Sequence, residues 1–151
     1  MRPHPYLRAY MAGIVVPTMF LLVIMSIDAY HRYYFEVSSQ FVTGLSARPL
    51  ERALLFPMAI VPNLWGVWNM VHLSLSSRVR LPLGLHGSLL VLILMPLGVF
   101  LARTLDVFPI QWRFALPMAP IGMVVYYLAW KYLVGFLNGE MGIWSAWNKQ
   151  A

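Results

Sequence analysis

Residues 9–27 read AYMAGIVVPTMFLLVIMSI and contain no Asp, Glu, Lys or Arg. Three further stretches share this property and are likewise bounded by charged residues: 53–77, 81–102 and 114–130. A helix rises about 1.5 Å per residue, so about 20 apolar residues cross a hydrocarbon core roughly 30 Å thick. Each stretch is therefore long enough, or nearly so, to cross a bilayer.

The composition agrees with membrane spans. The 151-residue chain is 60% hydrophobic and 11% charged, whereas a soluble domain carries about 25% charged residues. A backbone in lipid must satisfy its own hydrogen bonds, which favours helices. The sequence predicts an all-α integral membrane bundle of four proline-kinked transmembrane helices, forming a single domain over 1–151. The predicted spans are about 9–29, 53–73, 83–102 and 114–137.

Prolines are frequent inside these spans, and each removes an intrahelical hydrogen bond and can kink its helix. They are Pro17, Pro57, Pro62, Pro96, Pro117 and Pro120. Such kinks act as hinges in some transporters, but prolines are also common in membrane helices, where they shape a bundle. We favour the structural interpretation.

Several chemistries are excluded or unsupported. The chain has no cysteine, which excludes disulfides, thiolate metal sites, iron–sulfur clusters and cysteine nucleophiles. Serine-protease, zincin, phosphate-loop and dinucleotide-binding motifs are missing. The acidic residues all lie at or beyond the predicted membrane edge: Asp28, Glu36, Glu51, Asp106 and Glu140. No ionisable residue is therefore available near the midplane for proton-coupled transport.

The formal charge of +6 points to membrane lipid as a partner, not to nucleic acid, because the basic residues are scattered at the span ends. The short hairpin with Arg78 and Arg80, together with Arg2 and Arg8, favours both termini on the cytoplasmic side.

The second span carries a stripe of polar and aromatic residues at helical spacing: Met58, Pro62, Trp65, Asn69, His72 and Ser76. Polar groups in lipid face protein, so the stripe is expected to point into the bundle. One interpretation is a pocket for a lipid, quinone, haem or pigment, formed by Trp65, Asn69 and His72 with His86. The other is that Asn and Trp join helices by hydrogen bonds, and we favour it.

His72 and His86 flank the predicted hairpin between the second and third spans. Two histidines on neighbouring helices are suited to ligate haem or a chlorophyll magnesium. The simpler interpretation is that both are interfacial and hydrogen-bond water or headgroups, so no cofactor and no metal site is predicted. Gly84 and Gly87, on either side of His86, allow another element to approach closely.

The favoured function is that of a non-catalytic polytopic membrane protein that works through assembly, as a homo-oligomer or as a small subunit of a larger membrane complex. This interpretation is based on the aromatic content, on small-residue pairs such as Ala9/Gly13 and Gly98/Ala102, and on the small mass outside the spans. One alternative is a binder or conductor of a small apolar ligand. A second is a membrane enzyme at the Asp28/His31 membrane edge.

Overall fold

The computed structural model describes residues 4–35, 47–76, 78–104 and 112–143. Within 31–35 and 47–59, and at positions 28, 102, 112, 114 and 115, only the backbone is described. The described residues are almost entirely helical and include no strand, so the all-α prediction is confirmed.

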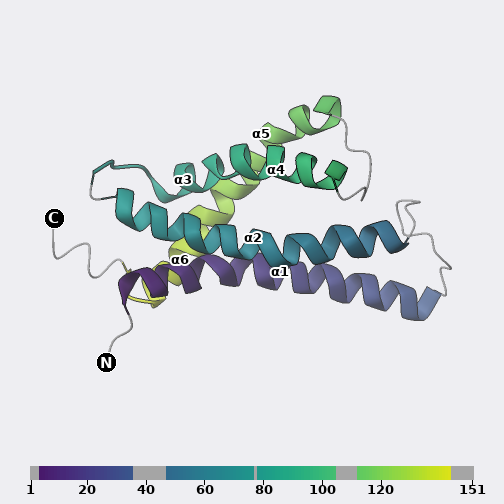
Figure 1. The fold of residues 1–151 in the computed structure, drawn as a ribbon. Coiled ribbons are helices and arrows are strands. Elements are labelled where there is room, and N and C mark those ends of the chain that lie inside the picture. The colour runs from purple at the N-terminus through teal and green to yellow at the C-terminus, as the bar shows by residue number, and fades with distance from the viewer. Residues whose placement is uncertain (1–3, 36–46, 77, 105–111, 144–151) are drawn as a thin grey trace.

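The helices form four rods. They are α1 (Pro5–Phe35), α2 (Ala47–Leu75), α3 (Leu83–Leu89), α4 (Val91–Thr104), α5 (Trp112–Leu128), the π-helix η1 (Ala129–Val134) and α6 (Gly135–Glu140). α3 and α4 continue one another through Leu90, and α5, η1 and α6 follow one another without a break (Figure 1). Pro17, Pro96, Pro117 and Pro120 lie inside helices.

Three segments are long and apolar enough to cross a membrane: Pro5–Ile27, Leu83–Leu101 and Leu116–Glu140. They correspond to the predicted spans 9–29, 83–102 and 114–137, with ends that differ by a few residues. The predicted span 53–73 lies inside α2 but is not among the three. The side chains up to residue 59 are not described and the rest of α2 is too short to span a membrane by itself, so this fourth span stays a prediction.

α1 and α2 form one close antiparallel pair (Figure 1). A Cβ on Gly13 would lie 2.6 Å from the Trp65 carbonyl oxygen, and a Cβ on Gly66 would lie 2.6 Å from the Tyr10 ring. Both glycines are therefore needed for this approach. Ala9 is also buried here, so the Ala9/Gly13 pair lies at a helix contact, whereas Gly98 has nothing within 4 Å of a Cβ.

α3 packs against α5 and η1 to form the second close pair. A Cβ on Gly87 would lie 2.0 Å from Cγ of Trp130, and one on Gly84 would lie 2.8 Å from the Tyr127 ring. The Trp130 side chain, at 0% exposure, lies directly over Gly87. Close approach at these two glycines was anticipated from the sequence, but its partner, a π-helix, was not.

The two pairs meet in a core of buried apolar residues, Trp65, Leu83, Leu90, Trp130 and Val134. A smaller cluster of Ala9, Ala12 and Ile143 lies where α1 meets the end of the described chain. Nearby, Arg8 donates a hydrogen bond from Nη1 to the Met141 carbonyl oxygen at 2.6 Å. The first and last described residues and the segment 78–82 before α3 thus lie at one end of the molecule (Figure 1).

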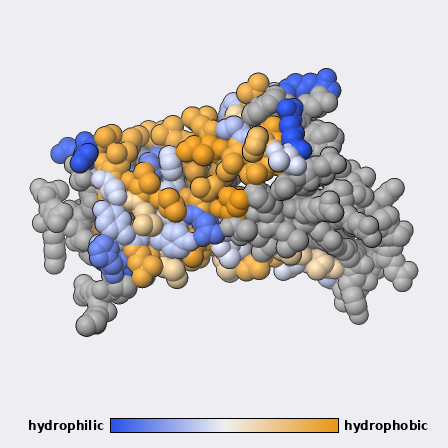
Figure 2. Space-filling model, viewed as in Figure 1, coloured by the Kyte–Doolittle hydropathy of each residue, from blue (hydrophilic) through white to orange (hydrophobic). Residues whose placement is uncertain are grey.

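The surface is apolar and the interior contains polar groups. Phe20, Phe100 and Phe136 are 66%, 63% and 65% exposed, while Asn69 and His86 are each 2% exposed. Figure 2 shows hydrophobic residues over α3 and α4 and the most hydrophilic ones gathered mainly toward the ends of the molecule. This distribution is the reverse of that in a soluble protein.

Candidate functional site

Asn69 joins three helices. Its Nδ2 donates hydrogen bonds to the Ala9 carbonyl oxygen at 2.7 Å and to Asn138 Oδ1 at 2.8 Å. Asn138 Nδ2 donates in return to Asn69 Oδ1 at 3.2 Å. Both amide hydrogens of Asn69 are used, so the side chain has no donor left for a ligand. Its role is to link α2 with α1 and α6 in apolar surroundings.

His86 and Trp68 make a second reciprocal contact, between α3 and α2. Trp68 Nε1 donates to the His86 carbonyl oxygen at 2.8 Å, and His86 Nε2 lies 3.0 Å from the Trp68 carbonyl oxygen. A carbonyl oxygen only accepts, so His86 Nε2 carries the hydrogen. The two rings also stack, with centroids 4.8 Å apart and planes at 21°.

His72 differs from these residues. Its side chain is 8% exposed and its ring centroid lies 4.7 Å from that of His86. The ring nevertheless makes no hydrogen bond with another described residue. Two imidazoles in contact leave no space between them for a haem plane, so ligation of one haem between both histidines does not fit. In the described part of the chain, no group of three or more His, Cys, Asp or Glu residues lies together.

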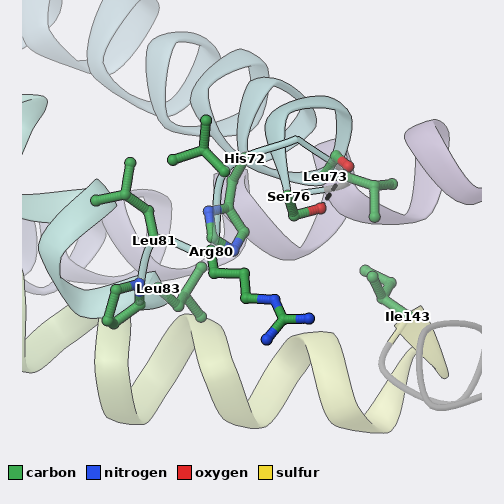
Figure 3. Close-up of a pocket in the computed structure, with 9 residues that line it drawn as sticks. His72, Leu73, Ser76, Arg80, Leu81, Leu83 and Ile143 are labelled. Carbon is green, nitrogen blue, oxygen red and sulfur yellow. Dashed lines mark hydrogen bonds between the residues drawn. The ribbon is translucent and has the colours of Figure 1, made fainter. Parts of the chain in front are cut away.

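His72 also lines a cavity of about 320 Å³ at the end of α2, beside the turn that leads into α3. The full lining is His72, Leu73, Ser76, Val79, Arg80, Leu81, Pro82, Leu83 and Ile143. In the view of Figure 3 the His72 ring lies near the base of the Arg80 side chain, the Arg80 guanidinium extends away from the ring, and Ile143 lies at the right.

Trp65 belongs to a different region. It packs on Tyr126 and Trp130, with ring centroids 4.9 and 5.3 Å away, and lines an apolar groove of about 770 Å³. The groove lies between α1 and the α5–η1–α6 rod, and Phe20 and Phe136 are among its lining residues.

The four residues predicted as one pocket therefore divide among three environments. Asn69 and His86 are held in hydrogen bonds between helices, Trp65 lines the groove, and His72 lines the end cavity. The sequence analysis missed Arg80 as a cavity residue and Asn138 as the partner of Asn69. A signal for Asn138 existed, since it is an amide next to a long apolar run.

The Asp28/His31 edge lies outside the residues whose side chains are described, so the enzyme alternative remains a prediction. Comparisons with protein-family models, with characterised proteins and with solved structures find no match to this chain.

Proposed function

We propose that this chain is a non-catalytic integral membrane protein whose four helical rods cross the bilayer and whose function is exercised through assembly, as a homo-oligomer or as a small subunit of a membrane complex. Both termini would lie on the cytoplasmic side. The observation that carries the proposal is that the Trp68 and Asn69 side chains of the second span hydrogen-bond to other helices, while large apolar side chains cover the exterior.

The membrane part of the proposal rests on solvation. Burying the exterior of α1, α4 and α5 in lipid removes side chains such as Phe20, Phe100 and Leu116 from water, which is favourable by about 25 cal/mol per Å² of apolar area. In water the same surface would cause aggregation, because contiguous apolar patches of this kind are rare on soluble monomers. The fourth crossing, by α2, follows because both ends of the described chain lie at the same end of the molecule.

The assembly part rests on the groove between α1 and the α5–η1–α6 rod. It is lined almost entirely by apolar side chains, and its residues Phe20 and Phe136 are among the most exposed of the described chain. Association of membrane helices is driven by van der Waals packing and hydrogen bonds, since lipid is as apolar as leucine. A concave surface flanked by aromatic rings gives a partner helix more contact area than a flat helix face.

The absence of cysteine permits a clean test. Single variants Phe20→Cys and Phe136→Cys, each purified in mild detergent and oxidised, are expected to form disulfide-linked dimers or to cross-link to a co-purifying subunit. Phe100→Cys is the matched control, because Phe100 is equally exposed and does not line the groove. A strictly monomeric mass without any partner would contradict the proposal. Equal cross-linking at all three positions would also contradict it, because the groove would then not be the contact surface.

The same groove supports a second candidate, a binder of a small apolar ligand, because it is a large apolar concavity whose lining includes the aromatic rings of Trp65 and Tyr126. Lipid extraction and a visible absorption spectrum of the purified protein distinguish the two. A stoichiometric quinone or pigment that is lost in Trp65→Leu would favour the binder, and a colourless sample without such a molecule would favour assembly.

A further inference from the structure

The end cavity contains polar groups that the bundle does not use. The His72 ring is buried and makes no hydrogen bond with another described residue. The exposed Arg80 likewise has no ion pair or hydrogen bond in the described chain. Ser76 donates its hydroxyl to the Leu73 carbonyl oxygen at 2.6 Å, which leaves its oxygen free only to accept. The groups directed into the cavity are therefore a cation and an imidazole.

Among the residues that the structure describes, no acidic one lines the cavity. A guanidinium offers several N–H donors in a planar fork, a geometry that fits the oxygens of a phosphate. The His72 imidazole, which lines the same cavity, adds a donor or an acceptor according to its tautomer. The charge of the site thus selects an anion, and its donors select one with several oxygens.

The remaining lining is apolar. Leu73, Leu81, Leu83 and Ile143 surround the two polar groups, and Figure 3 shows them on more than one side of Arg80. A small hydrated anion would lose water against these side chains and gain nothing from them. An amphiphile gains on both counts, because its charged head meets Arg80 and its first methylenes meet the leucines.

The position of the cavity fits such a molecule. Leu83 begins one of the three apolar segments, so the cavity lies where a span meets the aqueous phase. Arg8 and Arg78 lie at the same end of the molecule. Basic residues at this level attract anionic headgroups by about 1 kcal/mol each near the surface.

From these observations we infer that the cavity between the end of α2 and the start of α3 binds the phosphodiester of an anionic phospholipid. Arg80 pairs with the phosphate, His72 hydrogen-bonds one of its oxygens, and the glycerol and upper acyl chain lie against the leucines and Ile143. The inference rests on the proposed membrane embedding, because only then do lipids reach the site from the bilayer.

The test uses the full chain, delipidated in an uncharged detergent and titrated with dioleoyl phosphatidylglycerol. Bound lipid is counted by native mass spectrometry. We expect one molecule of dioleoyl phosphatidylglycerol to bind per chain, and to bind more tightly than dioleoyl phosphatidylcholine does. Arg80→Gln and His72→Phe should each weaken this binding by about tenfold, the effect of losing one hydrogen bond to a charged group.

Arg78→Gln is the matched control. It removes the same charge two residues away, at a side chain that does not line the cavity, and should change the binding by less than about twofold. Equal losses in Arg78→Gln and Arg80→Gln would show a general charge effect and overturn the site. Each variant must show the helicity of the wild type, so that a loss of lipid binding is not caused by unfolding.

Two further probes identify the source of the anion. If inorganic phosphate protects the protein against thermal unfolding as well as the lipid does, the site binds a free anion and the lipid assignment is wrong. If oleate binds as tightly as phosphatidylglycerol, the site recognises a carboxylate and the assignment is also wrong. Solubility of the chain without detergent would instead refute the membrane proposal, so the two failures are distinguishable.

Discussion

Asn69 and His72 lie three residues apart on α2, and both are buried polar side chains, yet they differ in what surrounds them. The Asn69 amide is saturated by Ala9 and Asn138, whereas the His72 ring contacts the His86 ring, lines a cavity and makes no hydrogen bond with a described residue. Burial alone does not separate a structural polar group from one available to a ligand. The number of its partners does.

The largest effect is expected from Gly87→Ala, which disturbs the environment of both residues. The new Cβ would fall 2.0 Å from Trp130 Cγ, so α3 must move away from η1 and carry His86 with it. Overpacking of this kind costs about 1–3 kcal/mol, and the buried Trp130 leaves little room for relaxation. Unfolding in detergent, followed by helicity, measures the change.

Gly98→Ala is its control, because nothing lies within 4 Å of the new Cβ. An exchange of Gly for Ala in a helix is favourable by up to about 1 kcal/mol, so this variant should be neutral or more stable. Equal destabilisation by both variants would mean that the close contact at Gly87 does not hold α3 in position.

A smaller effect is expected at the amide pair. Asn69→Ala leaves Asn138 and the Ala9 carbonyl without their partner, and Asn138→Ala removes the same side-chain contact from the other side. Each change should cost about 1–2 kcal/mol, and a double-mutant cycle should give a coupling of about 1 kcal/mol. Strictly additive losses would contradict the reciprocal hydrogen bonds.

The sequence predicts much of this architecture but not its tertiary partners. Uncharged runs and their lengths are local properties, so the helices and the candidate spans could be identified from them. The inward direction of Asn69 also follows, since an amide avoids lipid. Its pairing with Asn138, 69 positions later in the chain, depends on the crossing of α2 and α6, which no local pattern encodes.

The candidate site was predicted only in part for the same reason. His72 and His86 were expected to be neighbours because a short hairpin makes the second and third spans adjacent, and their rings do meet. From the sequence, Arg80 was only one of the basic residues that favour a cytoplasmic hairpin. Its contribution to a cavity depends on the path of the segment before α3. Turn geometry of this kind has no periodic sequence signal.

The smallest effect is expected at His72 and sharpens the comparison further. His72→Phe keeps the ring and removes no hydrogen bond of the described chain, so stability should stay within about 0.5 kcal/mol. His86→Phe is the matched variant, and it should lose about 1 kcal/mol, because the Trp68 carbonyl oxygen loses its donor. Chemical unfolding of the two variants measures both free energies of unfolding. A larger loss of stability in His72→Phe than in His86→Phe would show that His72 has a structural role.

The π-helix η1, from Ala129 to Val134, changes the side of the rod on which the following residues lie. A π turn accommodates an additional residue, so everything after it is rotated relative to an uninterrupted helix by about 100°, the angle that one residue occupies. That rotation is what brings Asn138 to the side of Asn69 while Trp130 fills the notch at Gly87. If the same residues formed an uninterrupted α-helix, the Asn138 amide would point away from Asn69, so the width of this turn matters as much as the identity of its residues.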